Sequence, residues 1–282
     1  MEVLMNYQDQ FGQLSFEVEG SFAYNKNEIT ELEVNPNIWS LVKAEGGAMK
    51  GYSQRGLFSL QFDGLNPEYG YPTYVGVNGE SKENYIWLQD NTVDYLKYHG
   101  PVDATFTGGY YNNFSYKNFT LSALFTFSAG NFVRLQPTIS ATYDDMTSMS
   151  RDIANRWIMP GDETRTNIPS ILDVFSTGAR VYAADGSTVD AVYPYNAYNY
   201  STERVAKGDF IRLKNISLSY QIPKSITSRL KLSTASVALV GNNIALLYSD
   251  KKLNGADPEF FNNGGVAMPI PRQYTFSLKV GF

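Results

Sequence analysis

The chain has 282 residues, of which 43% are hydrophobic, 15% aromatic and only 18% charged, and its formal net charge is −5. Its longest unbroken apolar run, Ile244–Tyr248, is far shorter than the roughly 20 residues of a membrane-spanning helix, which excludes a helical membrane protein. The aromatic content and low net charge exclude a disordered chain. Because the chain has no Cys, disulfides and Cys-ligated metals are excluded as well. A pI near 5 with scattered Lys and Arg indicates no nucleic-acid partner.

Alternation of apolar and polar residues with a period of two dominates the sequence, and it predicts long antiparallel β-strands. In the first of these strands Leu14, Phe16 and Val18 share one face, and Ser15 and Glu17 share the other. The six predicted strands, in chain order, span residues 14–24, 104–116, 119–128, 210–222, 232–248 and 272–282.

Only Lys117 and Asn118 separate the second and third predicted strands, which indicates a two-residue hairpin. Such a turn places Tyr116 opposite Phe119, and both belong to the apolar sets of their strands. The register of this hairpin is therefore self-consistent.

The strand at 210–222 is less regular, because Ile211 and Leu213 are out of phase with the apolar residues that follow them. Two explanations are open: a β-bulge near Lys214–Asn215, since one extra residue returns the alternation to the same face, or a strand end that stands clear of the apolar layer.

Long and short connections alternate along the chain, and two of the long ones have about 70 residues each. Connections of this length are unusual in a compact soluble sandwich. In an outer-membrane barrel they are expected, because short periplasmic turns alternate with long external loops. We therefore expect extracellular loops at about 25–102, 135–207 and 248–271.

Alternation alone does not decide whether the apolar face packs inside a sandwich or meets lipid. Strands of about 11–15 residues match tilted membrane strands better than soluble strands, which average about 5–6 residues. The chain also stops on an alternating aromatic and apolar strand, which resembles the signal read by the outer-membrane assembly machinery. The residues expected to form this signal are Tyr274, Phe276, Leu278, Val280 and Phe282.

Six segments resemble the C-terminal barrel portion of SusC/RagA-type TonB-dependent outer-membrane transporters of Bacteroidetes, in order and spacing. They are SFAYNKNEITEL (21–32), GGYYNNFSYKNFTLSALFTFSAGNFV (108–133), NRWIMPGDETRTNIP (155–169), GDFIRLKNISLSYQIP (208–223), VGNNIALLYSDKKLNGADPE (240–259) and PIPRQYTFSLKVGF (269–282). The GDFIRLKNISLSYQIP and GADPE segments are the most specific. Together the six segments cover most of the chain.

The resemblance implies an all-β fold, namely an antiparallel transmembrane β-barrel segment of about six C-terminal strands from a barrel of about 22. It implies part of an importer of glycans or peptides that works with a SusD-like lipoprotein and with TonB through a plug. No plug, TonB box or signal peptide can be read in this chain. We therefore expect the remainder of the barrel and the plug, in the same or a separate chain, as partners, together with outer-membrane lipid.

The resemblance implies no catalysis and no cofactor, and no metal site is predicted from the sequence. The best candidates for ligand or lipoprotein contact are loop aromatic residues, because their rings stack on sugars and dominate protein interfaces. They are Trp39, Trp87, Tyr193, Tyr195, Tyr198 and Tyr200. Packing within the loops is an equal alternative for them. Glu17 and Glu19 are expected to face the barrel lumen.

Two other functions stay open at this point. The first is a SusC-like barrel that acts as a structural or assembly subunit of a larger outer-membrane complex. The second, the least favoured, is a soluble carbohydrate-binding β-sandwich.

Overall fold

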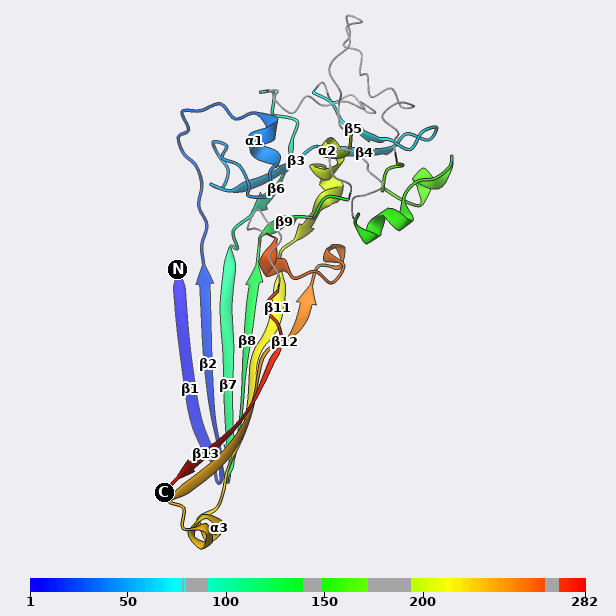
Figure 1. Cartoon of the computed structure of the whole chain (residues 1–282). Coiled ribbons are helices and arrows are strands. Elements are labelled where there is room, and N and C mark those ends of the chain that lie inside the picture. The colour runs from blue at the N-terminus through cyan, green and yellow to red at the C-terminus, as the bar shows by residue number, and fades with distance from the viewer. Residues whose placement is uncertain (78, 80–90, 139–148, 172–193, 262–268) are drawn as a thin grey trace, which may run out of the picture.

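The computed structural model describes residues 1–77, 79, 91–138, 149–171, 194–261 and 269–282. Figure 1 shows one long, curved sheet with loops and short elements gathered at its upper end. The connections at the lower end are short, apart from a small helical turn labelled α3, Lys224–Thr227. The upper assembly of loops is called the cap below, and the opposite end is called the short-turn end.

The sheet has seven antiparallel strands in the order β1-β2-β7-β8-β11-β12-β13. Their bounds are β1 Glu2–Phe11, β2 Leu14–Tyr24, β7 Phe106–Tyr116, β8 Phe119–Ala129, β11 Phe210–Gln221, β12 Thr234–Ser249 and β13 Gln273–Gly281. All six predicted strands form, and the predicted fold class of an antiparallel membrane-barrel segment is confirmed. The expected number of about six strands is one too low, because β1 was not predicted.

Strand β1 escaped prediction because a charged residue interrupts its apolar face. Tyr7 pairs with Val18 and Phe11 with Leu14, but Asp9 falls between them on the same face, opposite Phe16. Asp9 is tolerated there because its carboxylate accepts a hydrogen bond of 3.0 Å from the Tyr7 hydroxyl. Pairing with β2 therefore determines this strand more than its own pattern does.

The predicted hairpin and bulge are both confirmed. Tyr116 pairs with Phe119 across the turn, where Lys117 adopts a positive φ of 53°. The register between β8 and β11 shifts between Leu213 and Asn215, which leaves Lys214 as the extra residue. The bulge returns Ile211 and Leu213 to the apolar face, opposite Phe127 and Phe125.

No second layer covers the apolar face of the sheet in the described part of the chain. Side chains on this face remain exposed, as Leu218 (47%) on β11 and Phe276 (71%) on the edge strand β13 show. The other described sheets have only two strands each. A soluble sandwich buries the apolar faces of two sheets against each other, and the described residues do not form such a pair of layers.

The buried core lies in the cap instead. Its main cluster contains Ile38, Leu41, Val42, Phe58, Leu60, Tyr74, Leu96 and Ala197. The strands and α-helices of the cap are α1 Ile38–Val42, β3 Gly56–Ser59, β4 Phe62–Leu65, β5 Pro72–Tyr74, β6 Lys97–Pro101, β9 Phe132–Arg134, α2 Pro194–Asn199 and β10 Val205–Lys207. Its 3-10 helices are η1 Arg151–Asn155, η2 Asp162–Thr164, η3 Thr202–Arg204, η5 Lys251–Leu253 and η6 Pro258–Phe260.

The cap is built from the three long connections, at 25–105, 130–209 and 250–272, which all leave the sheet at the same end. Within it β3 pairs with β6, β4 with β5, and β9 with β10. None of the described helices is long and apolar enough to cross a membrane.

Candidate functional site

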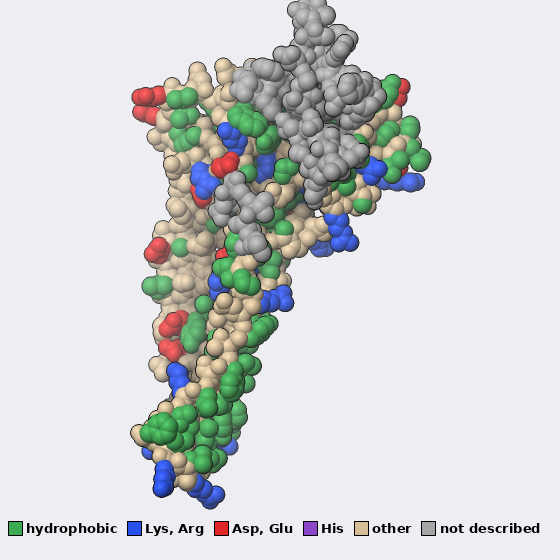
Figure 2. Space-filling view, viewed as in Figure 1, with side chains coloured by type: hydrophobic (Ala, Val, Ile, Leu, Met, Phe, Trp, Pro, Cys, Tyr) green, Lys and Arg blue, Asp and Glu red, His purple; other side chains and the backbone are tan. Residues whose placement is uncertain are grey.

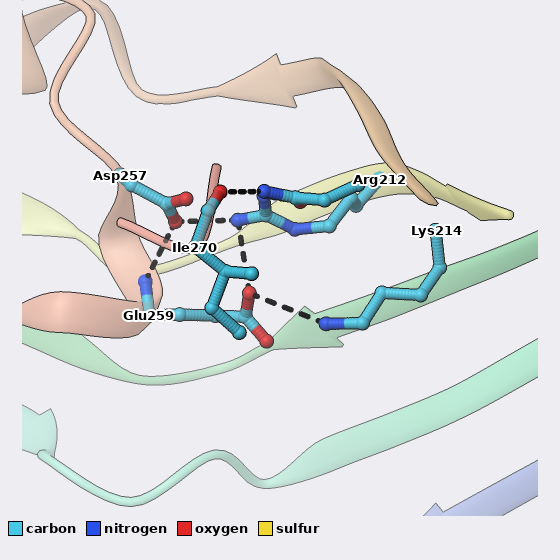
Figure 3. Close-up of polar contacts among 6 residues, drawn as sticks. Arg212, Lys214, Asp257, Glu259 and Ile270 are labelled. Atoms are coloured by element: carbon cyan, nitrogen blue, oxygen red, sulfur yellow. Dashed lines mark hydrogen bonds and ion pairs between the residues drawn. The ribbon is translucent and has the colours of Figure 1, made fainter. Parts of the chain in front are cut away.

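A buried ion-pair network joins the cap to the sheet, and it is centred on Arg212 of β11 (Figure 3). Ile211 and Leu213 lie on the apolar face, so Arg212 between them lies on the polar face. Its Nη2 atom is 2.5 Å from Asp257 Oδ1 and 2.9 Å from Glu259 Oε2. Lys214 Nζ adds a longer contact of 4.0 Å to the same Glu259 oxygen.

Asn243 of β12 extends this network to the far end of the same connection. Arg212 Nη1 donates a 2.7 Å hydrogen bond to Asn243 Oδ1, and Asn243 Nδ2 donates to the carbonyl oxygen of Ile270. Asn243 adopts a positive φ of 52°, which Asn tolerates better than most residues. The connection from 250 to 272 is therefore held at both Asp257 and Ile270. We call Arg212, Lys214, Asn243, Asp257 and Glu259 the Arg212 cluster.

The sequence analysis did not predict this cluster. Its residues do lie in the segments that carry the family resemblance: Arg212 in GDFIRLKNISLSYQIP, and Asp257 and Glu259 in GADPE. The available signal was the presence of two cations, Arg212 and Lys214, in the first of the two most specific segments and of two carboxylates, Asp257 and Glu259, in the second.

A cavity of about 460 Å³ adjoins the cluster. Arg212, Asn243 and Asp257 line one part of it, and Phe260 and Arg272 line another. Arg212 and Arg272 are the cations among the lining residues, and Arg212 is paired with Asp257 and Glu259. No group of three or more His, Asp or Glu side chains in the described ranges is placed to hold a metal ion.

The structure brings two of the six candidate aromatic residues together. The rings of Trp39 and Tyr200 meet edge to face with centroids 5.3 Å apart, and both are partly exposed. Lys43 Nζ lies 5.2 Å from the Trp39 ring. Among the candidate aromatic side chains that the structure describes, these two, which we call the Trp39–Tyr200 pair, are the partly exposed ones.

The other candidate aromatics are placed differently. Tyr198 is only 2% exposed and packs against Phe62, with ring centroids 5.9 Å apart, so it belongs to the core of the cap. Burial raises the pKa of its hydroxyl to about 12. Trp87, Tyr193 and the side chain of Tyr195 lie outside the described residues.

Arg134 of β9 packs against the Tyr200 ring of the Trp39–Tyr200 pair. Its guanidinium lies 5.7 Å from the Tyr200 ring, and it donates to Phe58 O at 2.6 Å, Ser59 Oγ at 3.0 Å and Ser201 O at 3.1 Å. These acceptors are uncharged, and burial lowers the pKa of Arg134 to about 9. One side chain thus joins three segments of the cap.

Glu17 and Glu19 lie on the polar face of β2, opposite the exposed apolar face. Glu19 Oε1 accepts a 3.2 Å hydrogen bond from Asn6 Nδ2 of β1. This position fits the predicted contact with the lumen, which stays a prediction. Likewise, Tyr274, Phe276 and Leu278 share the apolar face of β13, and their role in membrane assembly stays a prediction.

His99 of β6 is the single histidine and lies half-buried in the cap, where its ring centroid is 5.9 Å from that of Phe132. Burial, with smaller contributions from Arg134 and Lys97, lowers its pKa from 6.5 to about 4. The imidazole of His99 therefore binds a proton less tightly in the folded cap than in the unfolded chain. The stability of the cap should be greatest above pH 6.5 and decline as the pH falls toward 4.

We expect the cap to lose about 1 kcal/mol between about pH 7 and about pH 5, a value reduced for the partial exposure of the ring. Proteolysis of the cap at the two pH values measures this loss. A His99→Phe variant should flatten the dependence of cap stability on pH, because Phe has no titratable group. The fold should tolerate the change, since His99 Nε2 is buried and makes no hydrogen bond in the described structure. An equally steep profile in that variant would exclude His99 as the cause.

No family model matches the chain. Two curated relatives in Formosa agariphila are similar to it: TonB-dependent receptor P3 (26% identical, 85% of this chain and 22% of the relative) and TonB-dependent receptor P39 (24% identical, 88% and 26%). Solved structures of the RagAB peptide transporter and of the RagAB peptide importer in its closed-closed state match all of this chain. Their TM-scores are 0.71 and 0.67, with 19% identity, and the match covers 28% and 29% of those chains.

In sequence the chain is similar to part of the TonB-dependent receptors, and in fold it is similar to part of the RagAB transporter. The chain also has an exposed apolar sheet face, which is typical of membrane β-barrels. It spans about a quarter of the length of the proteins that it matches.

Proposed function

We propose that this chain is part of an outer-membrane importer of glycans or peptides, powered through TonB and working with a SusD-like lipoprotein. One observation carries the proposal. The chain forms a single curved sheet with an exposed apolar face and a polar face, and this sheet matches transporter structures along its whole length. The relatives are named as receptors and transporters, which supports transport without covalent chemistry.

In this proposal the cap lies on the extracellular side, because the long connections of outer-membrane barrels do. The cap has its own buried core, so it can present a fixed surface rather than loose loops. The Trp39–Tyr200 pair then serves as a stacking surface for a sugar ring or a peptide side chain, or as a docking point for the lipoprotein. The polar face of the sheet, with Glu17 and Glu19, faces the lumen and the plug.

The test is purification of the intact protein from detergent-solubilised outer membranes, followed by uptake measurements in cells that carry or lack it. We expect a lipoprotein to co-purify, and we expect uptake of labelled oligosaccharides or oligopeptides to require both the protein and the proton gradient. Unchanged uptake of both classes in the deletion strain would contradict import. That result would instead support the structural or assembly role in a larger outer-membrane complex.

A Trp39→Ala variant separates the binding surface from the core of the cap. Interface aromatics typically contribute about 2 kcal/mol or more, so we expect binding of the lipoprotein or the substrate to weaken by at least about tenfold. Isothermal titration with the purified partner or substrate measures the effect. Tyr69→Ala is the matched control, because Tyr69 is exposed and stacks on Tyr71 rather than on the Trp39–Tyr200 pair. Equal weakening in both variants would argue against a specific role for Trp39.

A further inference from the structure

The segment that joins β11 to β12 at the short-turn end of the sheet carries exposed cations and no side-chain carboxylate. Residues 222–233, which join β11 to β12, contain Lys224, Arg229 and Lys231 and no Asp or Glu. All three side chains are exposed, and none forms an ion pair in the described structure. This composition contrasts with a net charge of −5 for the whole chain.

A fourth cation lies close to this segment. Lys117 occupies the β7–β8 turn, and the next residue, Asn118, is joined to the end of β11 by two hydrogen bonds. Asn118 Nδ2 donates to Gln221 O at 2.7 Å, and Gln221 N donates to Asn118 O at 2.8 Å. The two turns are therefore neighbours. Figure 2 shows cationic and hydrophobic side chains together at the lower end of the molecule.

Apolar side chains accompany the cations. Thr227 is buried, whereas Ile226 and Leu230, four residues apart around α3 and the following 3-10 turn η4 (Ser228–Leu230), are 49% and 63% exposed. Short basic segments with an exposed apolar side are typical of chains that lie in the interface of a membrane.

The adjoining strand ends carry aromatic rings at the same level. Lys117 Nζ lies 5.2 Å from the centre of the Tyr116 ring, and the rings of Phe119 and Tyr220 are 4.5 Å apart. These three rings belong to the exposed apolar face, so they mark the level at which that face ends. Aromatic rings of membrane barrels gather at the membrane–water interface. A Lys side chain that packs on such a ring keeps its ammonium group at the level of the lipid headgroups.

We propose that the short-turn end is a binding surface for anionic phospholipid headgroups, formed by Lys117, Lys224, Arg229 and Lys231, with Ile226 and Leu230 inserted beside the acyl chains. This inference rests on the proposed placement of the chain in an outer-membrane barrel, where short turns meet the periplasmic leaflet. Each Lys or Arg near an anionic lipid surface strengthens attraction about fivefold, and salt screens it.

The experiment measures lipid preference of the intact protein in phosphatidylcholine bilayers. Trace spin-labelled phosphatidylglycerol or spin-labelled phosphatidylcholine is added, and the motionally restricted fraction of each is read by electron paramagnetic resonance. We expect the wild type to favour phosphatidylglycerol, with less preference at high salt. A K224Q/R229Q/K231Q variant should lose at least about fivefold of this preference.

A K26Q/K50Q/K251Q variant is the matched control, since it removes three exposed cations from the cap and leaves the short-turn end intact. It should keep the wild-type preference. If the triple variant at the short-turn end fails to fold, Lys117→Gln on the separate turn should still lower the preference, by about twofold to fivefold. Heat-modifiable migration in gels reports folding for every variant.

Equal association of both lipids with the wild type, or unchanged preference in folded K224Q/R229Q/K231Q, would overturn the proposal. Cation-dependent retention on peptidoglycan without any lipid preference would also overturn it, in favour of a cell-wall partner. Uptake and outer-membrane fractionation of the wild type are scored separately. If the wild type shows no lipid preference but still imports, the proposal for the short-turn end is wrong and the proposed function of the protein stands.

Discussion

Replacing Arg212 with Ala should lower stability by about 3–5 kcal/mol and free the 250–272 connection from the sheet. The side chain is only 3% exposed, and its removal leaves Asp257, itself nearly buried, without its cation. Glu259 retains only the longer contact to Lys214. Breaking one partner of a buried ion pair costs more than the pair contributes, because the remaining charge stays poorly solvated.

Limited proteolysis and denaturant unfolding of the purified protein measure this effect. We expect new cleavage within 250–272 and a lower unfolding midpoint. Arg55→Ala is the matched control: Arg55 also forms a 2.6 Å ion pair, with Asp103, but the two side chains are 37% and 49% exposed. Exposed pairs contribute at most about 1 kcal/mol. Similar losses in the two variants would show that burial of the Arg212 cluster is unimportant.

Neutralising Arg212 together with its two carboxylate partners provides a second, independent readout. A variant that combines Arg212→Met, Asp257→Asn and Glu259→Gln removes these three charges, and the charge that remains in the cluster, on Lys214, is 37% exposed rather than buried. It should be more stable than Arg212→Ala, because replacing a whole buried ion pair is often close to neutral. If the combined variant is less stable than Arg212→Ala, the hydrogen-bond geometry of the Arg212 cluster, rather than its charge balance, holds the 250–272 connection in place.

The strands were predictable because each carries its own signal. Alternation in β7 and β8, a two-residue turn between them and the phase change at Lys214 are all local properties of the sequence. A sheet with one face in lipid and one face in a polar lumen enforces that alternation residue by residue. Strand β1 escaped prediction because Asp9 breaks the pattern, so its place in the sheet is set by pairing with β2.

The site was harder to predict because its contacts join residues far apart in sequence. Arg212 and Asp257 are 45 residues apart, and nothing local to either indicates which partner it will meet. The aromatic candidates illustrate the same limit. Tyr198 and Tyr200 lie two residues apart in similar sequence surroundings, yet the first is buried against Phe62 and the second is partly exposed beside Trp39. Packing of the cap, not composition, separates core from surface there.

Placing an Arg at position 216 tests the assignment of the two sheet faces most directly. Ile216 lies on the apolar face of β11 between Ala123 and Gly241, midway between the aromatic rings at the short-turn end and the cap. On a lipid-facing position at the middle of the bilayer, Arg destabilises a membrane barrel by about 2–4 kcal/mol. Ile216→Arg should therefore reduce the heat-modifiable, folded fraction recovered from outer membranes, and lower the unfolding midpoint in lipid vesicles.

Two controls decide whether the cause is lipid exposure. Ser217→Arg introduces the same charge one residue further along the strand, on the polar face between Ser122 and Val240, and should cost about 1 kcal/mol or less. Ile216→Leu keeps the position apolar and should be almost neutral. If Ser217→Arg lowered the unfolding midpoint as much as Ile216→Arg, or more, the apolar face would not be the lipid face. Because a register slip of one residue exchanges the two faces, this comparison also tests the register of β11 beyond the bulge.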